Sequence, residues 1–528
     1  MKAWILAVVF GLAACSGSPG SSSSGSSSSS SSTGSSGTSS SSSGSSSGSS
    51  GTSGDAIVSC GTNGAPDCSS GAMRVESAGV AANPYDVLTA KVTVATQGAS
   101  SVRVLFQVGS ESVQTTPAFT ATTGNQVIPV LGLLPSTTYA LQVLAADNGG
   151  QLARSPVLSF TTAALPDSLS NYAFQIQQPG TVLPGHILLG KNLGLNVVPQ
   201  DAVIIDRSGR VVWYLEESGA SPRGDFAKQP DDSYTVSLAG TSDLPDSFPA
   251  VFQQVNSLGE PVRTWSLPGD GGTNLHDMRI QPNGDALMLG EGTLTVDMSA
   301  YDGGLTNAVL VGNTLNRVQP DGGVVFTYDF FDDFDPTDVD LGISHAGAFV
   351  DAIHANSIDV TGDGNYLVSA RDMSQVRKID AHTGEVIWKL GGARSDFTFP
   401  DDPLGGFSMQ HFARELGPDD ILLFDDGDEH SPSMSRAVEY QLHFDANGHP
   451  TTANMIWQYV PPLLPNGDHV FGSAKGSAQR LPDGHTLICY GTFPRVDEVD
   501  AEGNLVWQLS DPQSGSSFYR AVFVDSLY

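Results

Sequence analysis

The sequence predicts an all-β protein in which a small β-sandwich precedes a six-bladed β-propeller. Two observations lead to this prediction. Between residues 73 and 165, short strands alternate apolar and polar side chains with a period of two. From residue 166 to residue 528, a glycine-containing turn followed by an apolar pair, and usually by tryptophan, recurs six times without helical periodicity. Repeats longer than about 40 residues with turn residues at a fixed phase indicate a propeller with one blade for each copy.

Each repeat supplies the strands of one antiparallel blade. The six copies of the turn occupy residues 206–213, 256–265, 319–326, 380–388, 445–457 and 500–507. A second tight turn precedes most of them, so that each unit reads as four strands, and the tryptophans are expected to pack between adjacent blades. Residues 291–345 break the even spacing with an acidic insertion. Long insertions between strands are usually functional, so this one is expected to shape an entrance or a lid.

The predicted sandwich, residues 73–165, shows alternation at Val102, Val104 and Phe106. Residues 133–139 read Leu-Leu-Pro-Ser-Thr-Thr-Tyr, which resembles the tyrosine corner of fibronectin type III domains. We expect this domain to act as a spacer or docking module that carries no chemistry.

The N-terminal residues are predicted to lie outside both domains. Residues 1–15 combine a basic start with an apolar run too short to span a bilayer, which is typical of a cleaved export signal. The run ends in Leu-Ala-Ala-Cys15, which resembles the bacterial lipobox, whose cysteine receives a lipid; an ordinary signal peptide with a chance cysteine is the alternative. Residues 16–54 are almost purely Ser, Gly and Thr, a flexible linker with a reach of about 35 Å. We therefore expect an exported lipoprotein of the cell envelope, on the periplasmic or surface side of the outer membrane.

The chain has four cysteines, of which Cys15 is assigned to the lipid. Cys60 and Cys68 flank a Gly/Asn/Pro loop in the segment 55–72, and an oxidising compartment favours a small disulfide between them. A metal clip is the alternative, although two cysteines without two further ligands make a poor zinc site. Cys489 lies in an apolar strand and is predicted to be a buried small hydrophobe.

The balance of charge excludes some partners. The 24 basic and 56 acidic residues give a net charge of −32, and nucleic acid would require a basic face. The same acidity indicates that any membrane attachment depends on the lipid alone, because anionic headgroups attract basic segments. The sequence leaves a monomer and a homodimer equally open.

Three histidines occupy matching positions when the blades are aligned by their glycine turns. His276, His354 and His411 each precede the first strand of a blade, and the matching position near Ser477 in the last blade has no histidine. The first strand of a propeller blade is the innermost, so the three imidazoles are expected to converge on the central channel. Hydrogen bonding to neighbouring strands is the alternative role for a blade histidine.

Asn356 and Arg371 lie beside His354 in the same blade, which favours a functional site over a structural role. Imidazoles bind zinc, copper and iron, so a metal site is one reading. A nearby guanidinium repels cations and favours sulfate, phosphate or carboxylate, so we prefer an anion site. The sequence offers no calcium-binding arrangement for a quinone cofactor. We expect neither a metal nor a cofactor.

These residues lie in a stretch that resembles the bacterial arylsulfotransferases. The motifs that carry the resemblance occupy residues 353–371, 378–392, 407–411, 423–427 and 435–440, and the match extends over roughly residues 170–525. A β-domain before the propeller also fits this family. The resemblance implies that His411 carries a transient sulfuryl group. It also implies that His354 and Asn356 form the family's His-x-Asn, that Arg371 is its arginine, and that His276 is its earlier channel histidine.

The implied activity moves a sulfuryl group from a phenolic sulfate ester to a phenol, without a nucleotide sulfate donor and with ping-pong kinetics. His354 or His276 would protonate the leaving phenol, and Arg371 and Asn356 would stabilise the sulfuryl oxygens. A non-catalytic cell-surface propeller that binds an anionic or glycan ligand is the alternative.

Two departures from the family pattern stand out: Phe412 follows the nucleophile, and Asp426 replaces the asparagine of Phe-Asp-Asn-Gly. Both are expected to touch the surroundings of the site and to affect substrate choice more than chemistry.

Overall fold

The computed structural model describes residues 56–58, 73–170, 172–193, 200–215, 222–240, 248–269, 272–301, 303–339 and 348–528. The predicted lipid-bearing Cys15, the linker and the predicted disulfide partners Cys60 and Cys68 lie outside these residues. Cys489 is buried as a free thiol, as predicted. Within the described part of the chain, helix is confined to four short segments, none of them long and apolar enough to cross a membrane. They are α1 (Asp167–Ser170), η1 (Phe330–Asp333), η2 (Pro336–Asp338) and η3 (Arg371–Met373).

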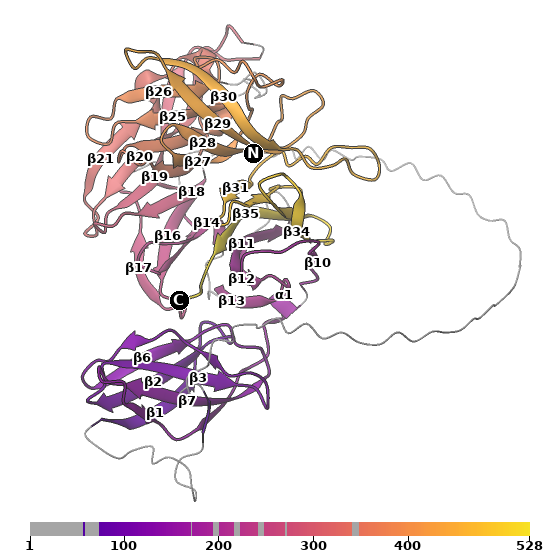
Figure 1. Cartoon of the computed structure of the whole chain (residues 1–528). Helices are drawn as coiled ribbons and strands as arrows, with labels where there is room; N and C mark the ends of the chain where they lie inside the picture. The colour runs from indigo at the N-terminus through magenta and orange to yellow at the C-terminus, as the bar shows by residue number, and fades with distance from the viewer. Residues whose placement is uncertain are drawn as a thin grey trace, which may run out of the picture. The chain divides into compact units, whose positions relative to one another are not determined.

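The predicted sandwich is present as two antiparallel sheets, drawn in indigo and violet in Figure 1. The first contains β1 (Arg74–Ala82), β2 (Ala90–Gln97) and β6 (Asn125–Val130). The second contains β3 (Ser101–Gln107), β4 (Gln114–Thr115), β5 (Phe119–Thr120), β7 (Thr138–Ala146), β8 (Leu152–Arg154) and β9 (Leu158–Thr161). Their core is built by alternate residues such as Val102, Val104, Leu141 and Val143, all buried.

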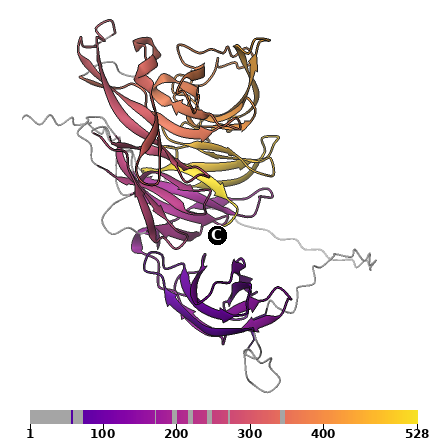
Figure 2. The same ribbon diagram turned by 90° about the vertical axis from the view of Figure 1, so that its left-hand side faces the viewer.

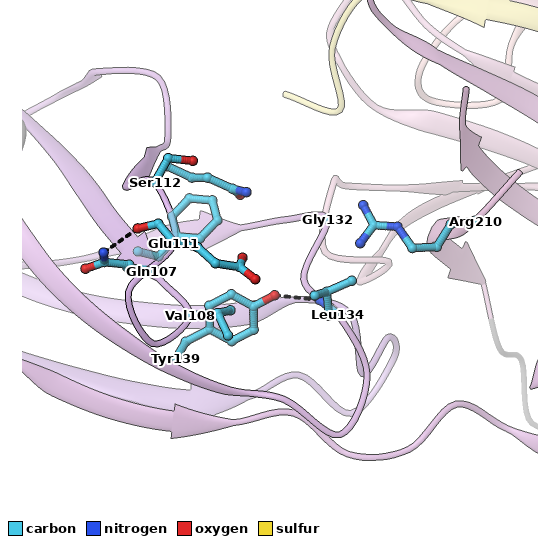
Figure 3. Close-up of a pocket in the computed structure, with 10 residues that line it drawn as sticks. Gln107, Val108, Glu111, Ser112, Gly132, Leu134, Tyr139 and Arg210 are labelled. Atoms are coloured by element: carbon cyan, nitrogen blue, oxygen red, sulfur yellow. Dashed lines mark hydrogen bonds between the residues drawn. The ribbon is translucent and has the colours of Figure 1, made fainter. Parts of the chain in front are cut away.

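The tyrosine-corner contact is made within this domain. The backbone N–H of Leu134 donates a hydrogen bond to the Tyr139 hydroxyl at 2.7 Å, as Figure 3 shows. Burial raises the pKa of this tyrosine, so the hydroxyl stays protonated. Kinship with fibronectin type III domains stays a prediction.

From β10 onward the strands form successive sheets, which are antiparallel apart from the parallel pairing of β20 with β22 (Figures 1 and 2). One sheet contains β35 (Ser516–Val524), β11 (His186–Leu193), β12 (Gln200–Asp206) and β13 (Val211–Leu215). A nine-stranded sheet contains β14 (Pro222–Lys228), β15 (Tyr234–Ala239), β16 (Pro249–Val255), β17 (Pro261–Trp265), β18 (Thr273–Ile280), β19 (Ala286–Val296), β20 (Ala308–Val318), β21 (Val324–Asp329) and β22 (Phe349–Asp351).

Three further sheets complete the arrangement. They contain β23 (Ala355–Val360), β24 (Tyr366–Ala370), β25 (Gln375–Ile379) and β26 (Val386–Gly391); then β27 (His411–Gly417), β28 (Asp420–Asp425), β29 (Arg436–Phe444) and β30 (Pro450–Tyr459); and finally β31 (Ser477–Arg480), β32 (Thr486–Cys489), β33 (Arg495–Val499), β34 (Leu505–Ser510) and β10 (Gln175–Gln177).

The innermost strands contact one another in a closed ring, which runs β14, β18, β23, β27, β31, β35 and back to β14. The fold is therefore the predicted all-β propeller. The count of six separate blades stays a prediction, because β14–β17 and β18–β21 share one sheet through Ala250 and Thr273.

The ring is closed by pairing strands from opposite ends of the chain. β35, the last strand, pairs with β11, with Leu189 opposite Ala521. β10, the first strand after the sandwich, pairs with β34, with Ile176 opposite Leu509. Both closures join residues more than three hundred positions apart, so the ring depends on the whole length of the segment.

The repeated turns and tryptophans have the roles that the repeat predicts. The turn glycines have φ angles between 76° and 91°, a left-handed conformation that side chains disfavour: Gly209, Gly259, Gly322, Gly384, Gly448 and Gly503. The indole N–H of Trp213 donates to the Ser257 carbonyl at 2.9 Å, and that of Trp507 donates to the Arg207 carbonyl at 2.8 Å. Each bond reaches the turn of the neighbouring sheet, so these tryptophans link adjacent sheets.

The predicted acidic insertion is described as far as residue 339, apart from residue 302. Its Phe330 is buried, and the carboxylate of Asp338 accepts hydrogen bonds from Arg394. The Lys389 ammonium pairs with Asp333. The insertion is thus anchored on the connection that precedes β27. Its role as an entrance or lid stays a prediction.

Candidate active site

The three predicted histidines lie together at the start of the innermost strands. The ring centroids of His276 and His354 are 4.7 Å apart, and the Phe248 ring lies 5.2 Å and 5.0 Å from them. Both imidazoles are close enough to His411 to lower its pKa. His276 belongs to β18, His354 directly precedes β23, and His411 begins β27, so three separate strands supply the cluster.

The backbone is strained where these side chains enter the site. His354 has a φ angle of 50°, and Phe412, directly after His411, has a φ angle of 56°. Residues other than glycine rarely adopt this conformation, and it concentrates at functional sites. Both strands carry a register irregularity here, between Ala355 and Ser357 and between His411 and Arg414. The irregularity changes which following residues face the channel.

The hydrogen bonds of His411 fix its tautomer. Its Nε2 lies 3.2 Å from the backbone N–H of Lys475, which can only donate, so Nε2 carries a lone pair. The proton therefore resides on Nδ1, which lies 2.7 Å from Oδ2 of Asp426. Burial, followed by the charge of Arg371, holds the His411 pKa well below its usual range. His411 is thus a neutral imidazole that is oriented by a carboxylate.

His354 is the histidine of the cluster whose protonated form is favoured. Its Nδ1 lies 2.6 Å from Oδ2 of Asp351 and 3.9 Å from Oδ2 of Asp372. Burial opposes the charged form, but the two carboxylates outweigh burial and raise the His354 pKa above its ordinary value. His354 is therefore the histidine best placed to donate a proton.

His276 is neutral and presents a second lone pair. Its Nδ1 lies 2.6 Å from the amide oxygen of Asn274, which can only accept, so the proton is on Nδ1 and Nε2 is free of it. Burial, then the charge of His354, holds the His276 pKa well below its usual range. The Tyr519 hydroxyl donates to the His276 backbone carbonyl at 2.9 Å and fixes this strand against β35.

Arg371 supplies the positive charge that the sequence predicted. Its Nη1 donates to Asp372 at 2.6 Å and its Nη2 donates to the Ser473 carbonyl at 3.0 Å. Asp428 lies 3.7 Å from Nη2. Burial lowers the Arg371 pKa, but these carboxylates and Asp426 outweigh burial and raise it, so the guanidinium stays charged.

Asn356 makes contacts that the sequence did not predict. Its amide nitrogen donates to the Gln410 carbonyl at 2.7 Å, and its amide oxygen accepts from the Phe412 N–H at 3.4 Å. The side chain is fully buried. Asn356 thus holds the backbone on either side of His411, and its contact with a sulfuryl group stays a prediction.

Lys475 belongs to the site and was not predicted. Its backbone N–H contacts His411, and its Nζ donates to the Ser517 hydroxyl at 3.2 Å. Burial lowers the pKa of this lysine to about 8. Lys475 lies two residues before β31, where the blade alignment found no histidine near Ser477. A search for histidines could not find it, although the register of the repeat points to its position.

The prediction about Asp426 was wrong. This departure from the family motif was expected to touch only the surroundings, but its carboxylate holds Nδ1 of His411 directly. Burial raises the Asp426 pKa well above its ordinary value, and Arg371 opposes that rise. Phe412, the second departure, packs beneath the site, with its ring 3.7 Å from the Arg414 guanidinium.

An ionic layer made of Asp225, Asp277, Arg414 and Arg520 lies below the histidines on the same innermost strands. Arg520 donates to Asp225 at 2.5 Å, and Asp277 lies 3.5 Å from Arg520 and 3.3 Å from Arg414. Burial favours protonation of Asp277, but Arg279, Arg520 and Arg414 lower its pKa to about 2. Arg520 also donates to the backbone carbonyl of Asn356, which connects the layer to the residue that brackets His411.

The described residues also allow the metal reading to be tested. Ligand atoms of Asp351, His354 and Asp372 lie within 4.8 Å of one another, close enough to share a cation. The guanidinium of Arg371 bonds to Asp372 at 2.6 Å, however, and so occupies one of these carboxylates with a positive charge. The donor set therefore suits an anion beside Arg371 better than a cation.

Comparison with known proteins points to one family. Residues 253–512 match the sequence model of the family described as Arylsulfotransferase (ASST). This range contains every predicted catalytic residue. No curated protein matches the chain.

Several solved structures are similar in fold. A protein of unknown function from Bacteroides caccae shares 17% identity over 65% of this chain and 100% of its own, with a TM-score of 0.40. A catalytically inactive virginiamycin B lyase from Staphylococcus aureus shares 11% identity over 65% and 90%, with a TM-score of 0.34. AztD from Citrobacter koseri shares 10% identity over 80% and 98%, with a TM-score of 0.22. At these values the likeness carries no inference about function.

Proposed function

Because the chain belongs to the arylsulfotransferase family and is an aryl sulfotransferase that uses no nucleotide sulfate donor, we propose that it transfers the sulfuryl group through a covalent intermediate on His411. The observation that carries this proposal is the hydrogen bonding of His411, whose Nδ1 is held by Asp426 and whose Nε2 lacks a proton. A neutral, oriented imidazole with a free lone pair is what a nucleophilic histidine requires.

In the first half-reaction, Nε2 of His411 attacks the sulfur of a phenolic sulfate ester. An N–S bond forms, the bond between sulfur and the phenolic oxygen breaks, and the departing oxygen takes a proton from His354. The raised pKa of His354 favours the protonated form that supplies this proton. The imidazole ring of His411 becomes positively charged, and the Asp426 carboxylate stabilises that charge.

Arg371 and the Lys475 backbone N–H stabilise the transferring group. The planar sulfuryl group carries its charge on its oxygens, and fixed donors act on such a group as they act on a transferring phosphoryl group. Arg371 is charged and buried, and the Lys475 N–H points at Nε2, where those oxygens arrive. The sulfate ester displaces this N–H from the lone pair of Nε2. A sulfuryl oxygen of the ester then accepts the hydrogen bond from the same N–H.

The second half-reaction reverses the first with a different phenol. The acceptor phenol gives its proton to His354, and its oxygen attacks the sulfur as the N–S bond breaks. The lone pair returns to Nε2 of His411, and the ester leaves. His276, whose ring lies 4.7 Å from that of His354, packs against the acceptor ring and orients it.

The test is the release of nitrophenol from p-nitrophenyl sulfate, with and without phenol, by the wild type and by His411→Ala. We expect phenol-stimulated release in the wild type and a loss of at least a thousandfold in the variant. Mass spectrometry of the donor-treated wild type, denatured at alkaline pH because the N–S bond is labile in acid, should place one sulfuryl group on the peptide that contains His411.

His485→Ala is the matched control, because His485 also contacts a carboxylate, Glu498 at 3.0 Å, outside the site. It should retain wild-type turnover. Normal turnover in His411→Ala would refute the covalent route. A folded wild type that is inert with several donors would favour the non-catalytic propeller that binds an anionic or glycan ligand.

We also propose that the enzyme is exported and held at the cell envelope by a lipid on Cys15, with a disulfide between Cys60 and Cys68. The support is the sequence alone: the lipobox, the Ser/Gly linker and the cysteine spacing. Mass spectrometry of the mature N-terminal peptide should show a lipid on Cys15, and Cys15→Ser should move the protein from the membrane fraction to the soluble fraction. An unmodified, uncleaved N-terminus would refute the proposal.

A further inference from the structure

A cavity of about 500 Å³ opens where hairpin turns of neighbouring strands meet, and no residue of the histidine site lines it. Its lining includes Pro230 from the β14–β15 turn, Pro282 from the β18–β19 turn and Gly364 from the β23–β24 turn. These turns follow the C-terminal ends of the innermost strands, whereas the histidines lie at the opposite ends. Because a strand rises by about 3.3 Å per residue, the cavity lies roughly 13 to 20 Å from the imidazoles along the strands.

The walls of this cavity, which we call the turn cavity, are largely apolar. Ile280, Pro282, Val360 and Tyr366 contribute to them. Val360 is 42% exposed although it is a large aliphatic residue. A cavity of this size with apolar walls and a few polar groups is typical of small-molecule sites. The walls suit a flat hydrocarbon ligand.

Two guanidinium groups line the same cavity. Among the described residues, Arg279 makes one ion contact, between its Nε and Asp277 at 3.4 Å. Arg317 donates from Nη1 to the Tyr366 hydroxyl at 3.2 Å, and its Nε lies 3.7 Å from Asp285. Both Nε atoms are buried and have no hydrogen-bond partner. The donors left for a ligand are the Nη groups of Arg279 and Nη2 of Arg317, for which the described residues give no hydrogen bond.

The lining carries an excess positive charge in a strongly acidic protein. The one carboxylate in the lining is that of Asp359, which already accepts a hydrogen bond from the Glu415 N–H at 3.0 Å. Asp277 and Asp285 approach the two Nε atoms at 3.4 Å and 3.7 Å but are not part of the lining. The surface of the cavity therefore presents two guanidinium groups and one carboxylate, although the chain has a net charge of −32. Arginine binds carboxylate and sulfonate oxygens through paired N–H donors, so this surface suits a monoanion.

We propose that the turn cavity is a second binding site, for a small aromatic monoanion such as an aryl carboxylate, sulfonate or sulfate. The aromatic ring lies against Ile280, Pro282, Val360 and Tyr366, and the anionic group pairs with Arg279 and Arg317. This proposal stands apart from catalysis, because it involves none of the groups that act on the sulfuryl ester.

The choice of test variants follows from the contacts. Arg279 touches Asp277 of the ionic layer, so its replacement would disturb the scaffold of the active site as well. Arg317 has no such contact, and exposed Val360 tolerates a charged side chain without a folding cost in the core. Arg317→Gln removes one anion partner, and Val360→Glu adds a negative charge to the wall. Arg74→Gln, an exposed arginine of the sandwich, is the matched control.

The probe is naphthalene-2-sulfonate, whose C–S bond prevents turnover, titrated calorimetrically into the full chain. The titration is carried out in an Arg371→Gln background, where the active site has lost its anion partner, so the remaining heat reports the turn cavity. We expect one equivalent to bind. Arg317→Gln and Val360→Glu should each raise Kd about tenfold or more, and Arg74→Gln should leave it unchanged. Neutral 2-naphthol should bind at least tenfold more weakly than the sulfonate.

Two results would overturn the proposal. One is the absence of sulfonate binding in the Arg371→Gln background when the wild type binds one equivalent, which would place all binding in the active site. The other is binding that neither Arg317→Gln nor Val360→Glu weakens. Neither readout requires turnover, so failure here is distinct from failure of sulfuryl transfer through His411.

Discussion

The ionic layer and the layer formed by the three histidines lie on the same innermost strands, but their charged groups are paired differently. In the ionic layer, the carboxylates of Asp225 and Asp277 meet guanidinium groups directly. In the histidine layer a few residues away, Nε2 of both His276 and His411 lacks a proton, and His354 has a strained backbone. The ionic layer pairs opposite charges across the ring, and the histidine layer presents two unprotonated imidazole nitrogens that carry lone pairs.

The first prediction breaks the ionic layer. Arg520→Leu leaves Asp225 and Asp277 buried without this partner, and removing one member of a buried ion pair costs about 3 to 5 kcal/mol. We expect the midpoint of urea unfolding to fall accordingly, with activity lost in proportion to the unfolded fraction. Unchanged stability would show that the layer does not hold the ring.

The second prediction breaks the histidine layer without touching the fold. Arg371→Lys keeps a charge but loses the fork that bonds Asp372 and Ser473, and loss of one donor to a transition state costs about 2.7 to 4 kcal/mol. We expect kcat/KM for p-nitrophenyl sulfate to fall about a hundredfold or more, with a melting temperature close to that of the wild type. If Arg371→Lys instead lost much stability and kept full activity per folded molecule, then Arg371 would hold the fold and would not act in catalysis.

The third prediction concerns the carboxylate behind the nucleophile. Asp426→Asn preserves an oxygen acceptor for Nδ1 of His411 but removes the charge that stabilises the sulfurylated ring. We expect kcat to fall about ten- to a hundredfold, by analogy with the range for replacing groups that orient the histidines of metal sites. Asp426→Ala should fall further, and equal activity of Asp426→Asn and the wild type would mean that orientation alone matters.

The fourth and smallest effect is a shift in pH dependence. The His354 pKa is raised in the folded state, so the protonated acid is present at lower pH and is lost as pH rises through that value. The stabilisation of the folded state by protonated His354 has the same pH dependence. It is fully present below the unfolded pKa and is lost as pH rises through the folded pKa. Asp351→Asn removes one carboxylate partner, so the alkaline limb of kcat/KM should move to lower pH.

Other groups face His354, namely His276, Arg371 and Asp372. Lys475 acts on His276, and burial lowers the Lys475 pKa to about 8. Lys475→Met is therefore the control for the pH profile. If it abolishes the alkaline limb, then the lysine and not His354 sets that limb.

The sequence could predict the elements whose signals repeat. The turn glycines and tryptophans recur at a fixed phase, and the same phase aligned His276, His354 and His411. The orientation of Asn356 could not be predicted, because register irregularities beside His354 and His411 change which residues face the channel. Lys475 contacts His411 through its backbone N–H. Every residue type except proline has this group, so the type of the residue gives no sign of the contact.

The innermost strand β35 links the assembly of the site to the late part of the chain. It follows the other innermost strands in the sequence, yet it closes the ring on β11 and supplies Tyr519 to the His276 backbone and Arg520 to the Asn356 backbone. A chain that stops before β35 therefore lacks both the closure and the support for two site residues. The ribosome must pass this strand before a functional pocket can assemble, so termination before Ser516 is expected to yield no partly active enzyme.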